Sequence, residues 1–320
     1  MAHQRVFVTG ASDFIGSYLV WRLRERGDRV RCLVSSPEEA ALFPNIGARV
    51  VVGDINDRPL VREAMKGCDV VFHLAEYFGA GLDEEEAALM EKINIEGAHT
   101  VLDVAFNIGI PRIVYASTAT IYPCPGNGDP FTQMYPRTKW EAYRQVVEPL
   151  LRRGAPIIIT MPGNVYGPGD TGIVGRLLER IVTRRLPILL AGDALVPWVY
   201  IDDAAQGHIL AAEQGRIGEQ YPLVDQCLTM RETIQLFQDI TGVPGPRLLG
   251  GQTSQSLANV ASAVLEKVVP LPLVMSAEAL RTMPDIHCIV SAEKTRRELH
   301  WETKPIEEAF RQTFEYYLER

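Results

Sequence analysis

The first half of the chain alternates short apolar runs with longer stretches whose apolar residues recur at helical spacing. "RVFVTG" is an apolar, β-branched run typical of a buried strand, and "FIGSYLVWRLRERG" carries its apolar residues on one helical face before a closing glycine. Further strand-like runs are "RVRCLV", "ARVVVGD", "DVVFHLA" and "RIVYAST", and helical stretches such as "RPLVREAMKG" and "NIEGAHTVLDVAFNIG" lie between them. Strands and helices alternating in this way predict an α/β fold, a Rossmann-like doubly wound parallel sheet with helices on both faces.

The second half has a different texture. Glycine and proline cluster at 162–172, and later segments look helical or loop-like. We therefore expect a smaller, mostly helical C-terminal substrate-binding region. The expected division is a dinucleotide-binding domain at 1–165 with a chain return at about 196–225, and a substrate-binding region at 166–195 and 226–320. The apolar segment 245–275 fits a core helix, the wall of an apolar pocket or a subunit contact.

Composition excludes several function classes. A net charge of -8 and a pI near 5.4 leave no excess of basic residues to neutralise nucleic acid. No apolar run approaches the about 20 residues that cross a bilayer, and the start of the chain leaves no room for a signal peptide, so we expect a cytoplasmic protein without a membrane span. The 5 cysteines and 6 histidines are scattered, which disfavours a disulfide framework or a metal site.

The stretch "VFVTGASDFIGSYLV" nearly matches a turn that binds a dinucleotide pyrophosphate. Gly10 and Gly16 stand at its first and last glycine positions, but Asp13 occupies the middle one. Two unit charges about 5 Å apart repel by about 3 kcal/mol at an effective dielectric of about 20, so weakened cofactor binding is expected. Aspartate tolerates left-handed backbone geometry better than most residues, and the Asp13 side chain can turn away from the phosphates or bond a helix N-terminal amide. Protonation of Asp13 is expected only toward its ordinary pKa of about 3.9.

A candidate acid–base pair occurs in "YPRTK". On a helix, Tyr135 and Lys139 lie one turn apart on the same face, and the ammonium group is expected to lower the pKa of the phenol. A tyrosine tuned in this way is a general acid or base. The hydroxyl-rich stretch "YASTATIYP" precedes it.

These motifs, with "VVGDI", "PGNVYGPGD" and "VYIDDAAQGH", resemble the extended short-chain dehydrogenase/reductase family, the NAD-dependent epimerase/dehydratase group with dihydroflavonol reductase-like members. The resemblance covers nearly the whole chain. It implies that Thr118 hydrogen-bonds the substrate oxygen, with Ser117 as the rival hydroxyl. It also implies that Tyr135 donates or accepts the proton, that Lys139 binds the nicotinamide ribose, and that the enzyme is a homodimer.

The same resemblance implies a set of cofactor-binding residues. They comprise the pyrophosphate turn, the surroundings of the adenine, those of the ribose and nicotinamide, and the acid–base site: Gly10, Asp13, Phe14, Ile15 and Gly16; Asp54 and Ile55; Leu74, Ala75 and Glu76; Ser117, Tyr135, Lys139, Pro162 and Val165. Ser35 stands where NAD-selective members carry an acid for the ribose diol. The cofactor is therefore NAD or NADP, and the missing acid tilts the choice toward NADP.

Departures from the family pattern narrow the chemistry. Ala119 and Thr120 replace the Asp-Glu pair of the dehydratases, while Met161 and Val196 stand where arginines often hold a sugar-nucleotide diphosphate. An apolar, partly aromatic site mouth is expected instead, although each of its residues fits core packing at least as well. The candidate substrate residues are Tyr77, Tyr122, Asn164, Tyr166 and Trp198.

Three functions remain open. The pattern favours an oxidoreductase that transfers hydride between nicotinamide and a secondary alcohol or ketone of apolar character. The alternative within the family is an NAD-dependent sugar-nucleotide 4-epimerase. The alternative of another class is a non-catalytic dinucleotide-sensing or scaffold protein, which the acidic residue at Asp13 suggests.

Overall fold

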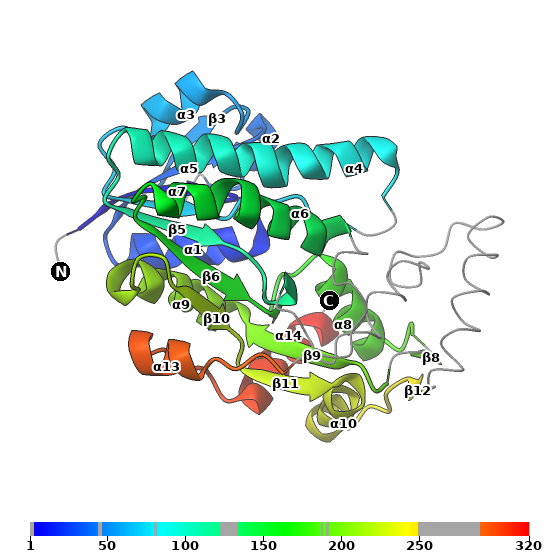
Figure 1. Cartoon of the computed structure of the whole chain (residues 1–320). Coiled ribbons are helices and arrows are strands. Elements are labelled where there is room, and N and C mark those ends of the chain that lie inside the picture. Colours follow the sequence, from blue (N-terminus) through cyan, green and yellow to red (C-terminus); the bar gives the residue numbers. More distant parts are fainter. Residues whose placement is uncertain are drawn as a thin grey trace.

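A seven-stranded parallel sheet forms the centre of the protein (Figure 1). The computed structural model describes residues 3–43, 47–79, 82–121, 134–186, 188–189, 192–248 and 289–319. The strand order is β10-β6-β5-β4-β1-β2-β3. Their bounds are β1 Arg5–Thr9, β2 Arg29–Val34, β3 Arg49–Val52, β4 Val70–His73, β5 Arg112–Ala116, β6 Ile157–Pro162 and β10 Gln220–Leu223. The predicted α/β fold with a parallel sheet is confirmed.

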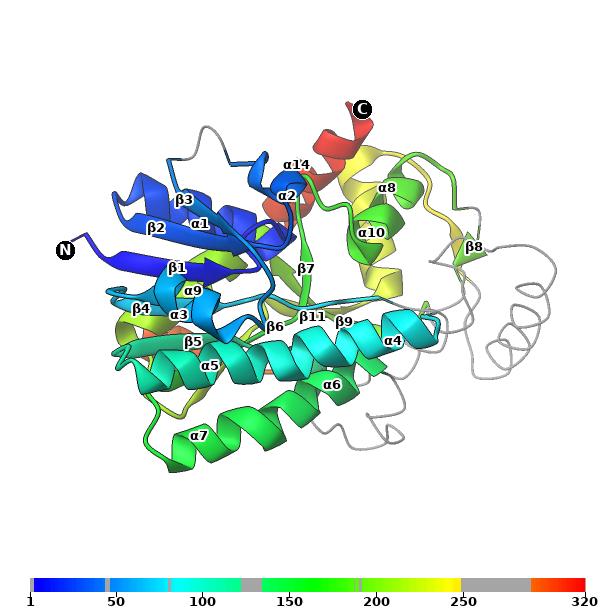
Figure 2. The same cartoon turned by 90° about the horizontal axis from the view of Figure 1, so that it is seen from above.

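Helices cover both faces of this sheet because successive strand residues point to opposite sides. Phe7 belongs to the core beneath one layer of helices, and its neighbours Val6 and Val8 belong to the core beneath the other. The first layer contains α3 (Arg58–Met65) and two long helical rods that lie side by side in Figures 1 and 2. The second contains α1 (Phe14–Glu25) and α9 (Ile201–Gln214), while the short α2 (Pro37–Ala40) follows β2.

Each of the two rods combines α-helical and π-helical turns. The first runs through α4 (Glu84–Glu91), the π-helical η1 (Lys92–Gly97) and α5 (Ala98–Asn107). The second runs through α6 (Met134–Ala142), the π-helical η4 (Tyr143–Val147) and α7 (Glu148–Arg152). The predicted helix at 136–147 therefore exists. Its π-helical turn is the kind of irregularity that occurs often near functional sites.

The later part of the chain forms a second, aromatic-rich core. A three-stranded sheet of β7 (Asn164–Tyr166), β9 (Leu195–Tyr200) and β11 (Gln226–Thr229) lies on the side toward which the arrowheads of β5 and β6 point in Figure 1. Around it lie α8 (Ile173–Val182), α10 (Met230–Thr241) and α14 (Ile306–Leu318), and β8 (Ile188–Leu189) pairs with β12 (Arg247–Leu248). α13 (Glu293–Leu299) packs against α9 and β10. The apolar segment singled out at 245–275 falls outside the described residues from 249 onward.

The strand order identifies where a ligand is expected to bind. From β1 the chain proceeds to β2 and β3 on one side and then crosses back to β4, β5 and β6 on the other. The switch point lies between β1 and β4, and parallel sheets bind ligands beyond the carboxyl ends of strands at such a point. The glycine turn follows β1, and the segment with Glu76 follows β4.

Candidate active site

The glycine turn after β1 leaves the start of helix α1 accessible. Gly10 has a φ of 69°, and a Cβ there would lie 2.6 Å from the backbone nitrogen of Ala75. A Cβ at Gly16 would lie 1.8 Å from the Gly10 carbonyl oxygen, so only glycine fits. The side chain of the N-cap residue, Asp13, accepts no hydrogen bond from the first turn of α1. The free N–H groups and the helix dipole favour an anion, and the turn fits a dinucleotide pyrophosphate.

Asp13 has neither of the backbone or capping geometries that the sequence suggested. Its φ of -72° and ψ of 167° are extended rather than left-handed, and its carboxylate does not cap the helix. The side chain is exposed. Desolvation by the surrounding protein, followed by the negative charges of Glu76 and Glu39, nevertheless raises the pKa of Asp13 to about 7. The expectation of an ordinary pKa was therefore wrong, and the charge of Asp13 changes within the physiological pH range.

The acid–base pair and the candidate hydroxyl meet at the carboxyl end of β5. Tyr135 and Lys139 lie one turn apart on α6, and the Lys139 Nζ donates to the carbonyl oxygen of Ala116, 2.8 Å away, at the last residue of β5. The Thr118 side chain lies just beyond this strand, where its hydroxyl hydrogen-bonds that of Thr120 at 3.1 Å, and it acts on Tyr135 so as to lower the pKa of the phenol. The rival hydroxyl of Ser117 is buried and has no hydrogen-bond partner among the described residues. This arrangement can hold a substrate oxygen between a hydroxyl and a phenol.

A carboxylate lies against this pair. The Tyr135 hydroxyl donates to Glu76, with both carboxylate oxygens 3.0 Å away, and the Lys139 Nζ lies 2.9 Å from Glu76 Oε2. Burial first, and then the charge and hydrogen bond of Glu76, raise the pKa of Tyr135 well above its ordinary value. Desolvation opposes the charged form of Lys139, but its pKa is raised overall by Tyr115 and Glu76. The expectation of a lowered phenol pKa was wrong, because the spacing of Tyr135 and Lys139 shows neither the burial of the phenol nor its contact with Glu76.

A buried asparagine connects the two segments that carry these groups. Asn94, in the π-helical turn η1, accepts from the backbone N–H of Tyr77 at 2.7 Å and donates to the Tyr77 carbonyl oxygen at 3.1 Å. It also donates to Thr138 Oγ1 at 3.0 Å, one residue before Lys139. The motif "NIEGAHTVLDVAFNIG" begins at Asn94, but nothing in its pattern predicts a role for this residue. Its side chain fixes the segment after β4 relative to α6.

Replacing Asn94 with alanine is expected to reduce the free energy of unfolding by about 2 kcal/mol, because the backbone N–H and carbonyl oxygen of Tyr77 lose their side-chain partner and Thr138 Oγ1 loses a donor. Asn107→Ala is the matched control, since the Asn107 amide bonds only Asp103, at the surface, among the described residues. Urea unfolding followed by circular dichroism measures both variants. Equal stability of the two would contradict the connecting role of Asn94.

The other residues assigned to the cofactor come to the same edge of the sheet. Most lie at the carboxyl end of a main-sheet strand or within the turn that follows it, namely Ser35, Asp54, Ile55, Leu74, Ala75, Ser117 and Pro162. Phe14 and Ile15 begin α1 and pack against the aromatic core, and Val165 lies in β7. Their shared location is compatible with one extended dinucleotide site, and their individual contacts stay predictions.

An acidic residue that the sequence analysis missed lies beside Ser35. Glu39, from α2, accepts from the Ser35 N–H at 2.9 Å and the Ser35 hydroxyl at 2.7 Å, and from the Ser12 hydroxyl at 3.0 Å. Desolvation would raise the pKa of Glu39, but these hydrogen bonds lower it overall. A charged carboxylate therefore lies between the end of β2 and the glycine turn. Glu39 was not predicted as a cofactor-binding acid because it lies four residues after Ser35, the position at which NAD-selective members carry one.

Two of the aromatic substrate candidates lie in the core. Tyr166 and Trp198 are 0% and 1% exposed, and the Trp198 indole N–H donates to Thr233 Oγ1 at 3.0 Å. These contacts favour the core-packing alternative for both residues. The other candidates are two half-buried residues and one outside the described residues: Tyr77, Asn164 and Tyr122, in that order.

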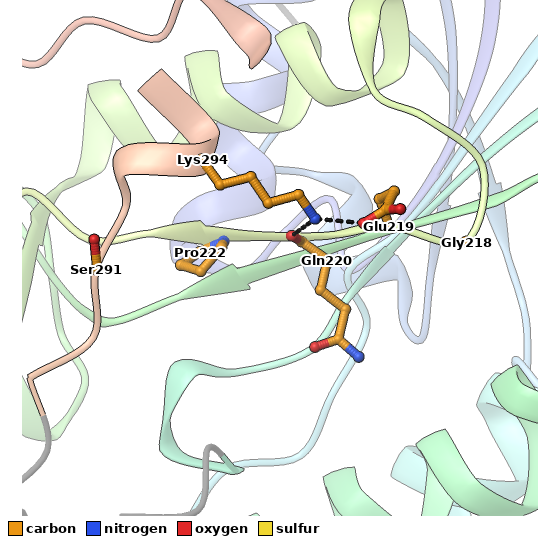
Figure 3. A pocket seen from close by; sticks show the side chains of 6 residues that line it. All are labelled: Gly218, Glu219, Gln220, Pro222, Ser291 and Lys294. Carbon is orange, nitrogen blue, oxygen red and sulfur yellow. Dashed lines mark hydrogen bonds and ion pairs between the residues drawn. The ribbon is translucent and has the colours of Figure 1, made fainter. Parts of the chain in front are cut away.

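A separate pocket of about 350 Å³ lies along the edge strand β10 (Figure 3). Lys294 projects across it and binds Glu219 and the carbonyl oxygen of Gln220, at 2.5 and 3.0 Å. The lysine and the glutamate thus satisfy each other, and none of the residues that line this pocket belongs to the acid–base site. Within the described part of the chain, no cluster of metal-ligating side chains occurs and no helix is long and apolar enough to cross a membrane.

Comparison with known families identifies the family to which this chain belongs. A model of the NAD dependent epimerase/dehydratase family matches residues 6–223. The chain belongs to this family. The match begins within β1 and ends with β10, so it includes the glycine turn, Glu76 and the Tyr135–Lys139 pair. The resemblance deduced from the motifs is confirmed, and the protein is an NAD(P)-dependent enzyme of the short-chain dehydrogenase/reductase type.

Relatives by sequence include reductases, and the solved structures with the same fold include an epimerase. The chain is 28% identical to 4-hydroxy-2-methyl-3-oxo-4-farnesyl-3,4-dihydroquinoline-1-oxide ketoreductase of Stigmatella aurantiaca, over 92% of this chain and 91% of the relative. It is 32% identical to short-chain dehydrogenase/reductase family 42E member 1 of Bos taurus, over 66% of this chain and 58% of the relative. The crystal structure of gox2253 superposes with a TM-score of 0.82 at 25% identity, covering 99% and 98% of the two chains. UDP-glucose 4-epimerase of Thermotoga maritima shares the fold, with a TM-score of 0.75 at 22% identity over 98% and 99% of the two chains.

Proposed function

We propose that this enzyme transfers a hydride between nicotinamide and a secondary alcohol or ketone, with Thr118, Tyr135 and Lys139 as its catalytic residues. The meeting of these side chains at the end of β5, close to the switch point, is the observation that carries the proposal. Thr118 fixes the substrate oxygen, Tyr135 Oη gives or takes its proton, and Lys139 binds the nicotinamide ribose. The nicotinamide, when bound, supplies or accepts the hydride.

We further propose that the substrate is largely apolar and binds against the region formed by 166–195 and 226–320. Val196 and Met161, at positions where sugar-nucleotide enzymes often carry arginine, are both buried in apolar cores. The ketoreductase relative, which aligns over nearly the whole chain, supports carbonyl reduction. A sugar-nucleotide 4-epimerase is the second candidate. It would retain NAD through purification and show no net cofactor turnover.

The test of the proposed function has two stages. Calorimetric titration with NAD and NADP measures whether the chain binds either dinucleotide. A screen of ketones and secondary alcohols, followed by nicotinamide absorbance, then measures net hydride transfer. Binding with turnover supports the oxidoreductase. Binding without turnover supports the 4-epimerase if NAD is retained through purification, and the sensor or scaffold alternative that Asp13 suggested if it is not.

The cofactor preference follows from Glu39. Its charged carboxylate, held by Ser35 and Ser12, supplies an acid at the place where the sequence lacked one. A carboxylate there accepts hydrogen bonds from a ribose diol and repels a 2'-phosphate. We therefore propose NAD as the preferred cofactor, opposite to the tilt toward NADP that Ser35 alone gave.

Glu39→Gln is expected to improve NADP binding by about fivefold, because it removes a repulsion on the order of 1 kcal/mol at a partly exposed site, and to change NAD binding little. Glu38→Gln is the matched control, since Glu38 is the exposed neighbour on the same short helix. Calorimetry with both cofactors gives the ratio of the two dissociation constants. An unchanged ratio in Glu39→Gln would remove Glu39 from cofactor selection.

Assembly and location are also proposals. We propose a homodimer that pairs through the segments 95–110 and 136–152, which belong to the two rods lying side by side on one face of the sheet (Figure 2). Such pairing would join the same surface of each copy around a two-fold axis. The cytoplasmic location stays a prediction from the sequence.

A further inference from the structure

Glu76 makes the acid–base site of this protein a three-member ionisable group. Its carboxylate oxygens lie 3.0 Å from the Tyr135 hydroxyl, and one of them lies 2.9 Å from the Lys139 Nζ. The tyrosine and the lysine therefore share one anionic partner. The proposed function uses Tyr135 and Lys139 as a pair, and it assigns no role in proton transfer to this carboxylate.

The position of Glu76 is built into the fold. The next residue, Tyr77, is held by the Asn94 side chain at both its N–H and its carbonyl oxygen. Asn94 also bonds Thr138 on the helix that carries Tyr135. On the other side, the ring of Phe78 packs edge-on against Tyr135, with ring centres 4.7 Å apart. The segment after β4 and helix α6 are thus locked together with the carboxylate facing the phenol.

The hydrogen bond specifies where the proton resides. An ionised carboxylate only accepts hydrogen bonds, so the proton between Glu76 and Tyr135 belongs to the phenol. A lysine alone would stabilise a phenolate, but here the negative charge of Glu76 offsets the positive charge of Lys139. Loss of the phenol proton would place two negative oxygens at hydrogen-bond distance.

We propose that Glu76 is a positioning residue that keeps Tyr135 protonated and thereby adapts the site to carbonyl reduction rather than alcohol oxidation. This inference rests on the proposed function. In reduction, the substrate carbon gains the hydride and its two electrons, the carbonyl π bond breaks, and the oxygen takes the proton of Tyr135. Water then returns a proton to the phenolate. Water reaches the phenol from the side of Glu76, since the Glu76 side chain is 28% exposed and that of Lys139 is 3% exposed.

The other charged and titratable groups around the Tyr135 phenol also leave it protonated. Burial raises the pKa of Tyr135 first, Glu76 and Tyr115 of β5 add to the effect, and the Thr118 hydrogen bond opposes it. His73 of β4 is neutral, because burial and the Lys139 charge lower its pKa to about 3. Asp13, before α1, interacts with Glu76 and so adds negative charge to this part of the site when it is ionised.

The direct test is the ionisation of Tyr135 in the full-length protein without ligands. Tyrosine labelled with ¹³C at Cζ reports phenol ionisation by NMR, and the spectrum of Tyr135→Phe assigns the signal. In the wild type, we expect the phenol to stay protonated at pH values above the ordinary pKa of tyrosine. In Glu76→Gln, which keeps the size but not the charge, we expect the apparent pKa to fall by one unit or more.

A matched control separates this effect from general loss of charge. Glu91, the last residue of α4, forms an ion pair with Arg137 at 2.9 Å on the protein surface. Arg137 lies two residues after Tyr135 on α6. Glu91→Gln is expected to leave the titration of Tyr135 unchanged. If circular dichroism shows that Glu76→Gln does not fold, Glu76→Ala repeats the measurement without an amide. If the Tyr135 phenol in the folded Glu76 variant titrates at the same pH as in the wild type, the inference is overturned.

Kinetics distinguish failure of this inference from failure of the proposed function. With a ketone found in the screen, the pH above which the reduction rate declines is expected to move lower in Glu76→Gln. Near-normal turnover by Tyr135→Phe would defeat the proposed function itself. Loss of turnover in Tyr135→Phe combined with an unshifted Tyr135 titration in Glu76→Gln would defeat the role of Glu76 alone.

Discussion

Tyr135→Phe is expected to lower turnover by about 100-fold or more while cofactor affinity changes little. The variant keeps the ring and its edge-on packing with Phe78 but removes the only proton that the phenol can transfer. Lys139 keeps its contacts with Glu76 and the Ala116 carbonyl oxygen, so the ammonium group stays in place. The loss therefore belongs to the chemical step and should appear in kcat.

Single-turnover measurements with the best ketone of the screen, followed by nicotinamide fluorescence, give the rate of the chemical step. Tyr143→Phe is the control, since Tyr143 lies further along the same helical rod and stacks on Trp140, so it loses a hydroxyl without changing the site. A Tyr135→Phe rate within a few-fold of the wild type would exclude Tyr135 as the proton donor. Equal losses in both variants would point to a structural effect of the rod.

The fold was predictable because its signals are local. Each strand of the main sheet before β10 is a short apolar run. Helical stretches separate these strands along the chain, and parallel pairing of strands requires such crossover connections. The strand β10 lies within the chain return expected at about 196–225, but its pairing was not predictable, because nothing in a sequence states that residues far along the chain pair with β6. Trp198 and Tyr166 show the same limit, since burial against α10 and α14 depends on tertiary packing.

The candidate site was predictable where spacing on one element fixes geometry. Tyr135 and Lys139 share a helix face, and the spacing of Gly10 and Gly16 along the chain defines a tight turn. The roles of Glu76 and Glu39 were not predictable, because each depends on contacts with residues from another segment. The direction of the pKa of Tyr135 was wrong for the same reason, and so was the titration expected for Asp13.

Asp13 is expected to make the stability of the protein depend on pH near neutrality. Its pKa is about 7 in the folded chain and close to 3.8 when unfolded. Between these values the folded state holds the extra proton, so the free energy of unfolding falls as pH rises from about 4 to 7 and stays reduced above that. Since Asp13 is exposed, solvent screening limits the effect to about 1 kcal/mol. Asp13→Asn should therefore be more stable than the wild type at pH 8 and equally stable at pH 4, measured by urea unfolding.

The same carboxylate is expected to weaken dinucleotide binding only when it is ionised. A pyrophosphate at the start of α1 adds negative charge beside Asp13 and raises its pKa further, so binding at pH 8 should take up a proton. Wild-type affinity for NAD should consequently rise about tenfold from pH 8 to pH 6, while Asp13→Asn binds tightly at both. Calorimetry in buffers of different ionisation enthalpy measures affinity and proton uptake together, with Asp193→Asn, an exposed partner of Arg231, as the control. Asp13→Gly separates charge from bulk: binding equal to that of Asp13→Asn assigns the whole cost to the charge. Weaker binding by both variants, with no proton uptake in the wild type, would mean that Asp13 supports the turn.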